Sequence, residues 1–264
     1  VGQSTGTLAF TQAPMIDVSG TLTYQAAPDT NGSATFTVIL MDDGSSSSPN
    51  SNTSDPVSIT INVTAVNDAP TFTLAGNQMV NEDPDPPTVT VPNFFTNPQP
   101  GPIDEQAGGD NAQTLTLPPN VAVISSDNDD LFSADPFIDA QGTLTYTPAT
   151  NEFGFATVRV TLTDSGDTAN GGENSSSQEF TITVTPVNDA PVVTTNTGLT
   201  VRKEDAGTIT KAQLETTDVD FDGLTYTVSI LPTAGNLLLN GEVQTGQPTF
   251  TQQDINGGKL SYQH

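Results

Sequence analysis

The sequence contains no cysteine and no tryptophan, and its single histidine is the last residue, His264. Without cysteine the chain has no disulfide, no thiol nucleophile and no thiolate metal site. A Ser-His-Asp triad and a histidine-based zinc site are excluded within these 264 residues for lack of histidine. Carboxylate pairs remain, but they fall at predicted turns and seams, and there is no tryptophan to hold a sugar ring. The composition therefore predicts a protein that is not an enzyme.

Basic residues are equally scarce. Lysine and arginine together number 5 against 31 acidic residues, and none precedes Arg159, so the formal net charge is -26. Nucleic acid is excluded as a partner, because binding phosphate requires cationic side chains. No apolar run approaches the roughly 20 residues of a transmembrane helix. The acidity has two interpretations: a solvated surface that keeps an extracellular protein soluble, or carboxylates neutralised by divalent cations.

The chain repeats itself with an offset of 122 positions. Residues 21–44 align with residues 143–166 without a gap, and 12 of these 24 positions are identical. The match extends in both directions, which predicts three domains: the later half of a repeat over residues 1–69, a complete copy over 70–190, and a different partial unit over 191–264. Either this is an excerpt of a longer protein or the open edges of the partial units are filled by other chains.

Short alternating segments rich in β-branched residues run through both copies of the repeat. Examples are Val57–Val63, Thr35–Leu40 and Ala156–Leu162, separated by clusters of Gly, Asn, Asp and Pro. No convincing helical periodicity occurs before residue 191. In the last unit, 223–228 and 236–239 are further candidate strands. The pattern predicts an all-β protein built of antiparallel sandwiches.

One motif closes each copy of the repeat. Residues 65–70 read Ala-Val-Asn-Asp-Ala-Pro, and residues 186–191 read Pro-Val-Asn-Asp-Ala-Pro. Proline and the residue before it favour extended backbone, so each motif is a short, stiff connection between two strands. The Asn and Asp oxygens just before it suit a hard cation such as Ca²⁺. We call these segments the first junction and the second junction.

The junction motif resembles the linker of cadherin-like and Ig-like repeats in large bacterial surface proteins of the adhesin type. Residues 70–190 also resemble one recurrent repeat of that group, through Asn81-Glu82-Asp83, Gly101-Pro102, Gly142–Tyr146 and Asp164-Ser165-Gly166. Residues 191–264 resemble the chondroitin-sulfate-proteoglycan type of cadherin-like repeat, through Asp218-Val219-Asp220 and 250–264. The resemblance implies tandem Ig-like/cadherin-like Greek-key β-sandwiches arranged end to end.

The resemblance also implies calcium between consecutive domains. For the second junction it points to five ligands: Glu82, Asn188, Asp189, Asp218 and Asp220. For the first junction it points to Asn67, Asp68 and Asp164, with Asp104 and Glu105 near the place of the missing Asp-x-Asp. Because the upstream glutamate is also missing there, the first junction is expected to hold fewer ions or none.

These features predict a non-enzymatic extracellular segment, at a bacterial cell surface, that acts as a stalk or adhesin with junctions stiffened by calcium. Its partners are then the neighbouring repeats and a cell-surface carbohydrate or protein ligand. Two alternatives remain open. One is a structural subunit of an extracellular filament that self-assembles by strand exchange between chains. The other is a carbohydrate- or protein-binding module using a loop face such as 92–111.

Overall fold

The computed structural model describes residues 4–264 and is almost entirely β-structure. The described residues contain one short α-helix, α1 (Gln252–Asn256), and one 3-10 turn, Ala169–Gly171. The chain divides into two compact units, residues 1–185 and 186–264. Within residues 4–264 no helix has the length and hydrophobicity needed to cross a membrane. The expected all-β fold class is confirmed.

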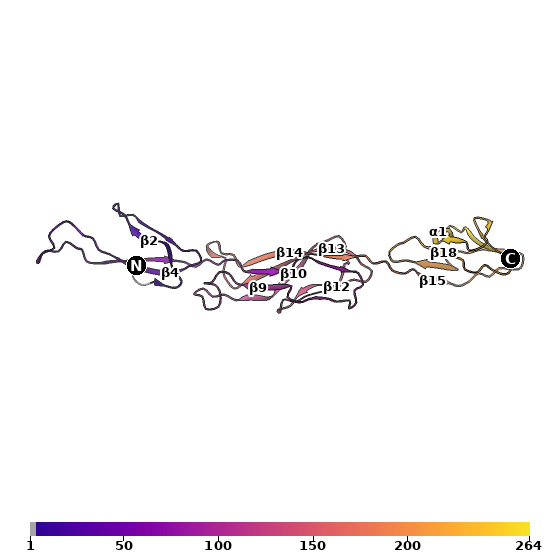
Figure 1. Cartoon of the computed structure of the whole chain (residues 1–264), viewed down its shortest axis with the longest axis horizontal. Helices are drawn as coiled ribbons and strands as arrows, with labels where there is room; N and C mark the ends of the chain where they lie inside the picture. The colour runs from indigo at the N-terminus through magenta and orange to yellow at the C-terminus, as the bar shows by residue number, and fades with distance from the viewer. Residues whose placement is uncertain (1–3) are drawn as a thin grey trace. The chain divides into compact units, whose positions relative to one another are not determined.

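Two facing layers of strands form the part of the first unit that follows the first junction (Figure 1). One sheet has the order β10-β13-β14-β7, and the other layer contains β11-β12-β8 and β6-β9. The strands are β6 (Thr71–Leu74), β7 (Gln78–Asn81), β8 (Val89–Val91), β9 (Phe95–Gln99), β10 (Leu115–Ser126), β11 (Phe132–Ile138), β12 (Leu144–Pro148), β13 (Gly154–Asp164) and β14 (Ser175–Thr185). All pairs are antiparallel except β14 with β7.

The two layers share one hydrophobic core. Val158, Val160 and Leu162 alternate along β13 and are fully buried, as the period-two pattern of this strand requires. From the other layer, Leu144 and Tyr146 of β12 enter the same core. Burial raises the pKa of Tyr146 to about 12. On the solvent face of the first sheet, Arg159 and Glu179 form an ion pair at 2.8 Å. This is a β-sandwich.

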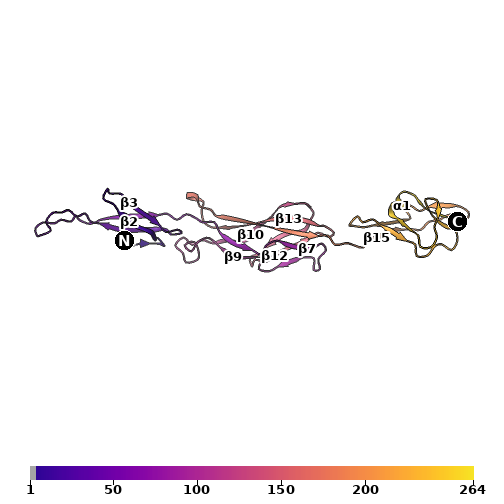
Figure 2. The same ribbon diagram turned by 45° about the horizontal axis from the view of Figure 1, so that its top comes forward.

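The strands before the first junction repeat this architecture only in part. They are β1 (Ser4–Thr5), β2 (Phe10–Ile16), β3 (Leu22–Ala26), β4 (Gly32–Val38) and β5 (Val57–Val63). They form the sheets β1-β4-β5 and β2-β3, the latter visible side by side in Figure 2. The β4–β5 ladder pairs Ala34 with Ile61, just as β13–β14 pairs Ala156 with Ile182.

Burial distinguishes the two copies. Leu162 is fully buried, whereas Leu40, its equivalent 122 positions earlier, is 72% exposed. Tyr146 is 2% exposed and its equivalent Tyr24 is 44% exposed. The same sequence pattern therefore builds the same ladder in both copies, but only residues 70–185 enclose a full core.

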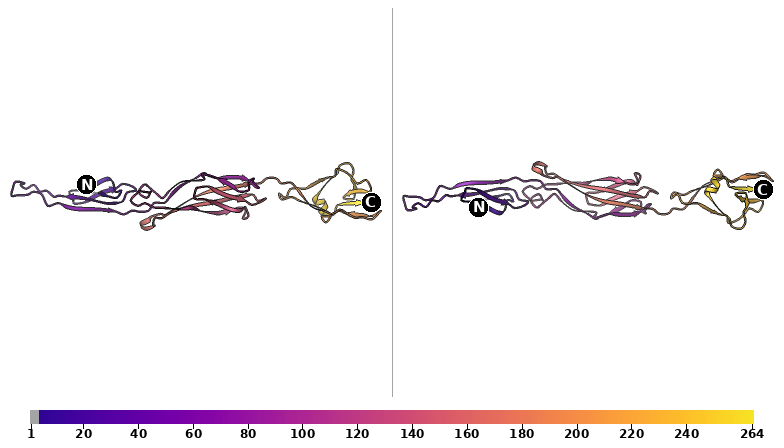
Figure 3. Two further views of the ribbon diagram at one scale, coloured as in Figure 1. Left: turned by 90° about the horizontal axis from the view of Figure 1, so that it is seen from below. Right: turned by 90° about the horizontal axis from the view of Figure 1, so that it is seen from above.

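Residues 186–264 form the second unit. Its strands are β15 (Val192–Asn196), β16 (Ala206–Thr208), β17 (Leu214–Thr217), β18 (Thr225–Thr227), β19 (Asn236–Leu239), β20 (Glu242–Val243), β21 (Thr249–Thr251) and β22 (Leu260–Gln263). Phe250, Ile255 and Leu260 are the buried centre of its small core, with Ile255 supplied by α1. The helix is the short yellow coil near the C-terminus in Figure 3. Strand 236–239 is found as expected, whereas the expected strand 223–228 is shorter, as β18.

Candidate metal centre

Three separate segments of the first unit meet at the first junction. Asn67 and Asp68 lie between β5 and β6, Asp104 and Glu105 lie in the loop between β9 and β10, and Asp164 is the last residue of β13. Gln113 joins them from the end of the β9–β10 loop, where its backbone N–H donates to the carbonyl oxygen of Glu105 at 2.8 Å. We call these six residues the first-junction cluster.

Four members of the cluster are buried, and three of these four are acidic. Glu105 is fully buried, and Asn67, Asp104 and Asp164 are only 5–6% exposed. The sequence has no lysine or arginine before residue 159, and Arg159 is paired with Glu179. Burying carboxylates is costly unless a positive charge or hydrogen bonds compensate. Within the protein, the hydrogen bonds that these carboxylates accept are what offsets the cost of burying them.

The three buried carboxylates of the cluster, Asp104, Glu105 and Asp164, each receive a hydrogen bond at one oxygen. Asp68 N donates to Glu105 Oε1 at 3.0 Å, and Gly166 N donates to Asp164 Oδ1 at 2.8 Å. Asn31 Nδ2, from the strands before the junction, donates to Asp104 Oδ2 at 3.3 Å. These contacts orient the side chains and leave the second oxygen of each carboxylate unsatisfied.

Five buried oxygen atoms at the junction have no hydrogen-bond partner. They are Asn67 Oδ1, Asp104 Oδ1, Glu105 Oε2, Gln113 Oε1 and Asp164 Oδ2. All five are acceptors, three from carboxylates and two from amide carbonyls. Buried polar atoms are nearly always paired, so five unpaired acceptors at one place mark a position where a hydrogen-bond donor, such as water, or a cation would fit. A hard cation takes this mixture of oxygens.

Two glycines make room for these oxygens. A Cβ atom added at Gly101 would collide with Glu105 Oε2, and one added at Gly166 would collide with Asn67 Oδ1. The Gly166 Cβ would also lie 2.6 Å from Gln113 Oε1, so the two amide oxygens are close neighbours. Both positions are in motifs that the sequence singles out, Gly101-Pro102 and Asp164-Ser165-Gly166. Their physical role is space for the oxygens of the cluster.

Electrostatics of the cluster are unfavourable in the absence of a cation. Burial, together with repulsion from Asp68, Asp104 and Asp164, raises the pKa of Glu105 above its ordinary value. Burial, followed by repulsion from Asp29, Asp104 and Glu173, likewise raises the pKa of Asp68. A bound divalent cation would reverse this effect by stabilising the charged forms.

At the second junction, the residues of the second unit form an open arrangement. Asp189 N donates to Asp220 Oδ2 at 2.7 Å, and Asp220 N donates to Asp218 Oδ1 at 2.9 Å. Asn188 is exposed and its Nδ2 donates to the carbonyl oxygen of Asp189. The structure thus brings Asp189, Asp218 and Asp220 together. Glu82 belongs to the other unit, where it is buried at the end of β7, and its grouping with these residues stays a prediction.

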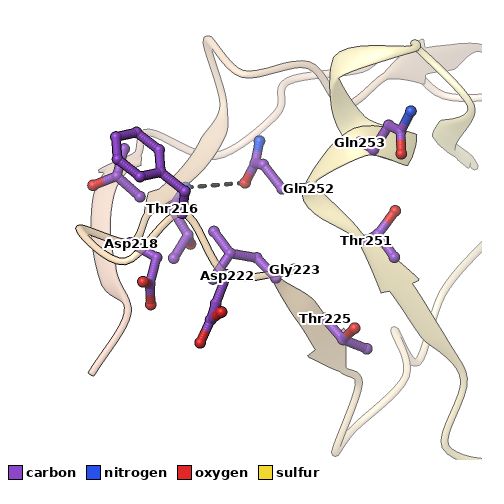
Figure 4. A pocket seen from close by; sticks show the side chains of 11 residues that line it. Thr216, Asp218, Asp222, Gly223, Thr225, Thr251, Gln252 and Gln253 are labelled. Carbon is purple, nitrogen blue, oxygen red and sulfur yellow. Dashed lines mark hydrogen bonds between the residues drawn. The ribbon is translucent and has the colours of Figure 1, made fainter. Parts of the chain in front are cut away.

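Next to these aspartates is a cavity of about 580 Å³. Figure 4 shows the Asp218 and Asp222 carboxylates on one side of it and Thr251 and Gln252 on the other. Gln252 Oε1 accepts a hydrogen bond from Thr216 N at 3.0 Å, which ties α1 to the end of β17. The cavity is open and its acidic residues are partly or fully exposed.

Counting only His, Cys, Asp and Glu side chains, residues 4–264 contain no group of three or more arranged to hold a metal ion. Asp104, Glu105 and Asp164 therefore do not form such a group by themselves, and the two amide oxygens are the other unpaired acceptors of the first-junction cluster. Sequence reasoning identified Asn67, Asp68, Asp104, Glu105 and Asp164 but not Gln113 or Asn31. No sequence signal marks Gln113 beyond its position in the same loop as the two acids.

Comparison with known proteins adds a family match for one part of the chain. The profile of a cadherin-like domain family matches residues 191–264. Human chondroitin sulfate proteoglycan 4 is 39% identical over 88 residues, 32% of this chain and 4% of that protein. Human FRAS1-related extracellular matrix protein 2 is 29% identical over 87 residues, 32% of this chain and 3% of that protein. Mouse extracellular matrix organizing protein FRAS1 is 34% identical over 91 residues, 33% of this chain and 2% of that protein.

The chain therefore spans only 2–4% of the length of these relatives. Among solved structures, Drosophila N-cadherin EC1-4 aligns with 100% of this chain and 59% of its own, with a TM-score of 0.34 and 12% identity. The protocadherin GammaB4 extracellular domain aligns with 93% of this chain and 38% of its own, with a TM-score of 0.39 and 16% identity. The cadherin-like character expected of residues 191–264 is confirmed by the family match.

Proposed function

We propose that this chain is a non-enzymatic extracellular segment in which calcium, bound at the junctions between β-sandwich domains, holds neighbouring domains together. In this role the segment is part of a stalk or adhesin on a bacterial surface, and its domains are 1–69, 70–190 and 191–264. The observation that carries the proposal is the set of five unpaired, buried acceptor oxygens at the first junction.

The residues present fit calcium. Calcium in proteins takes 6–8 oxygen ligands, from carboxylates, carbonyls and waters, without strict geometry. Asp104, Glu105, Asp164 and Asn67 would hold it through the oxygens that hydrogen bonds leave unused. The ion supplies positive charge and no other chemistry. What the chain supplies is orientation, because the opposite oxygen of each of the three carboxylates is already fixed by an N–H donor.

Binding at this place would stiffen the junction because the ligands come from the connecting segment and from the sandwich that follows it. Asn67 and Asp68 belong to the connection itself, while Asp104 and Asp164 belong to the sandwich that follows. Asn31, from the strands that precede the junction, is in turn attached to Asp104. Without the cation these carboxylates repel one another, which favours opening of the junction.

An extracellular location is supported by two observations. Two of the relatives are named as extracellular matrix proteins, and both match about a third of this chain. The composition is in keeping with this, because the chain has 31 acidic residues that can bind calcium and no cysteine that would need protection from oxidation.

Calcium titration by isothermal calorimetry tests the proposal. Asp104→Asn keeps the size of the side chain and its hydrogen bond with Asn31 but removes the charge, and should weaken binding at the first junction at least about tenfold. Asp135→Asn is the matched control, since Asp135 is an exposed aspartate of β11. The proposal fails if the wild-type chain takes up no calcium, or if the two variants bind it equally well.

A further inference from the structure

The outer face of the sheet β10-β13-β14-β7 carries almost no charge, although the chain is strongly acidic. These four strands contain three charged residues, and one of them, Asp164, is buried. The other two, Arg159 and Glu179, point outward from paired positions and neutralise each other at 2.8 Å. All other acidic residues of 70–185 lie outside these strands. In a chain of net charge -26, this neutral face is where another acidic molecule meets little repulsion.

Large apolar side chains are exposed at one end of the same face. Phe155 of β13 is 47% exposed and Met79 of β7 is 76% exposed. They lie in one row across the sheet, because Phe155 pairs with Thr183 of β14 and Thr183 pairs with Met79. Neighbouring strands are about 4.8 Å apart, so the Thr183 methyl group joins the two larger side chains into one apolar strip.

The first copy of the repeat shows that the sheet itself does not require these side chains. Ser33 stands at the position equivalent to Phe155, and Thr37 at the position equivalent to Arg159, each 122 residues earlier. The β4–β5 ladder forms all the same, with hydroxyl side chains paired on its outer face. An exposed ion pair adds only about 1 kcal/mol or less to stability. The apolar strip and the ion pair therefore indicate a role beyond holding the strands together.

We propose that this face binds the same face of a second copy of the chain, with the two copies parallel, so that β13 of each copy packs on β14 of the other. The inference goes beyond the proposed function and does not require calcium. It also differs from strand exchange, because every strand stays in its own sheet.

The positions of the two charges favour the parallel arrangement. Arg159 and Glu179 are paired with each other near the middle of β13 and β14. In a two-fold contact with its axis along the strands, Arg159 of each copy meets Glu179 of the other, and the four charges alternate in sign. With the axis across the strands, Arg159 would meet Arg159 and Glu179 would meet Glu179. Juxtaposed like charges repel, so the antiparallel contact is disfavoured.

The size of the face fits a weak dimer. Strands β10, β13 and β14 have 12, 11 and 11 residues, whereas β7 has 4. At about 3.3 Å per residue and about 4.8 Å between strands, the face measures roughly 600 Å² in each copy. Two copies would bury about 1,200 Å² in all, the lower end of the range for specific interfaces. Association should therefore be weak and most important where copies are concentrated.

Sedimentation equilibrium of the full chain, up to millimolar concentration and in salt that screens the net charge, tests the contact. Wild type should dimerise reversibly both in calcium and in chelator. Phe155→Ser introduces the residue of the first copy and should weaken dimerisation about tenfold. The control is Phe137→Ser, since Phe137 is 51% exposed on β11 of the other layer. A wild type that stays monomeric, or equal effects of the two variants, would overturn the inference and leave the calcium proposal intact.

Exchange of the charges separates binding from stability of the sheet. Arg159→Glu and Glu179→Arg should each abolish self-association, because either variant opposes charges of one sign across the two-fold contact. An equimolar mixture of the two variants should dimerise again, since a negative face then meets a positive one. If the ion pair serves only to stabilise its own sheet, the mixture stays monomeric and the inference is wrong.

The direction of the two copies can be measured separately. Because the chain has no cysteine, a single Ser175→Cys substitution at the exposed start of β14 can carry a spin label. The labels of two parallel copies should lie within about 20 Å of each other, since equivalent residues are then at the same level of the packed sheets. In an antiparallel dimer centred on the ion pair they would be roughly 30 Å apart, which would overturn the parallel arrangement.

Discussion

Glu105 is the residue of the first junction at which the effects of calcium and of its removal should differ most. It is fully buried and its pKa is raised, mainly by burial and then by its acidic neighbours. Glu105→Gln removes the buried charge and should therefore raise the midpoint of thermal unfolding measured in chelator. The same variant should bind calcium at least about tenfold more weakly. Thermal unfolding with and without calcium checks both expectations, the higher midpoint in chelator and the weaker binding of calcium. A variant that is less stable than wild type in chelator would contradict this account.

Asp254 provides a pH-dependent test in the second unit. Its pKa is lowered by hydrogen bonds from the Thr251 backbone and side chain and by Lys259, as expected of a capping box that begins α1. A lowered carboxylate pKa stabilises the fold above the unfolded value, 3.8, and this stabilisation is lost as the pH falls through the lower folded value. Asp254→Asn should therefore lower the urea concentration at which the second unit is half unfolded at neutral pH, as followed by its NMR resonances. The difference between wild type and variant should shrink below pH 3.8. Asp222→Asn is the control. A difference in urea midpoint between wild type and Asp254→Asn that does not depend on pH would contradict the prediction.

At the scale of single strands, the internal repeat offers a matched comparison. Leu162 of β13 is fully buried, and Leu40, at the equivalent position after β4, is 72% exposed. Leu162→Ala should lower the free energy of unfolding by about 2–5 kcal/mol, because it leaves a cavity in a closed core. Leu40→Ala should change it by no more than about 0.5 kcal/mol. Urea denaturation measures both, and equal losses would mean that the region before the first junction has a core like that of residues 70–185.

Strands were the part of the fold that the sequence predicted best. Segments 57–63 and 236–239 are strands with the expected bounds, the first as a run rich in β-branched residues and the second as a short apolar run. Strand β14 begins with Ser175–Ser177, which pair with Thr161–Thr163 in the ladder although serine has little β propensity of its own. Helix α1 was not anticipated: five residues are too few for a helical period, and the Thr251–Asp254 capping box was its only local signal.

The candidate site was predictable where its residues belong to motifs. Asn67, Asp68, Asp104, Glu105 and Asp164 were expected from the resemblance alone, and the structure brings them to one junction. The first junction was nevertheless expected to be the poorer of the two. The reason was that the Asp-x-Asp and the upstream glutamate are missing there. The second amide, Gln113, was not anticipated, because it reaches the cluster through a loop conformation fixed by a backbone hydrogen bond to Glu105, which no sequence pattern encodes.

At the scale of the whole molecule, calcium bound at the junctions should restrict the motion of one domain relative to the next. Small-angle scattering in calcium should give a narrower range of dimensions than in chelator, because bound ions fix the junctions. Asp189→Ala should reproduce part of the chelator effect and weaken calcium binding at the second junction about tenfold, because it removes the carboxylate of a residue whose backbone N–H lies on Asp220 Oδ2. Wild-type and variant scattering that agree under both conditions would remove Asp189 from the ligand set.

The placement of Arg159 has a consequence for digestion by proteases. It is the first site in the chain for an enzyme that cuts after lysine or arginine, and the next is Arg202. Arg159 lies inside β13, paired on both edges by β10 and β14, with its guanidinium on Glu179. A trypsin-like enzyme cannot thread a paired inner strand through its cleft, so cleavage there requires the sandwich to open first. The chain up to Arg202 should survive such an enzyme as one large fragment for as long as that sandwich stays closed.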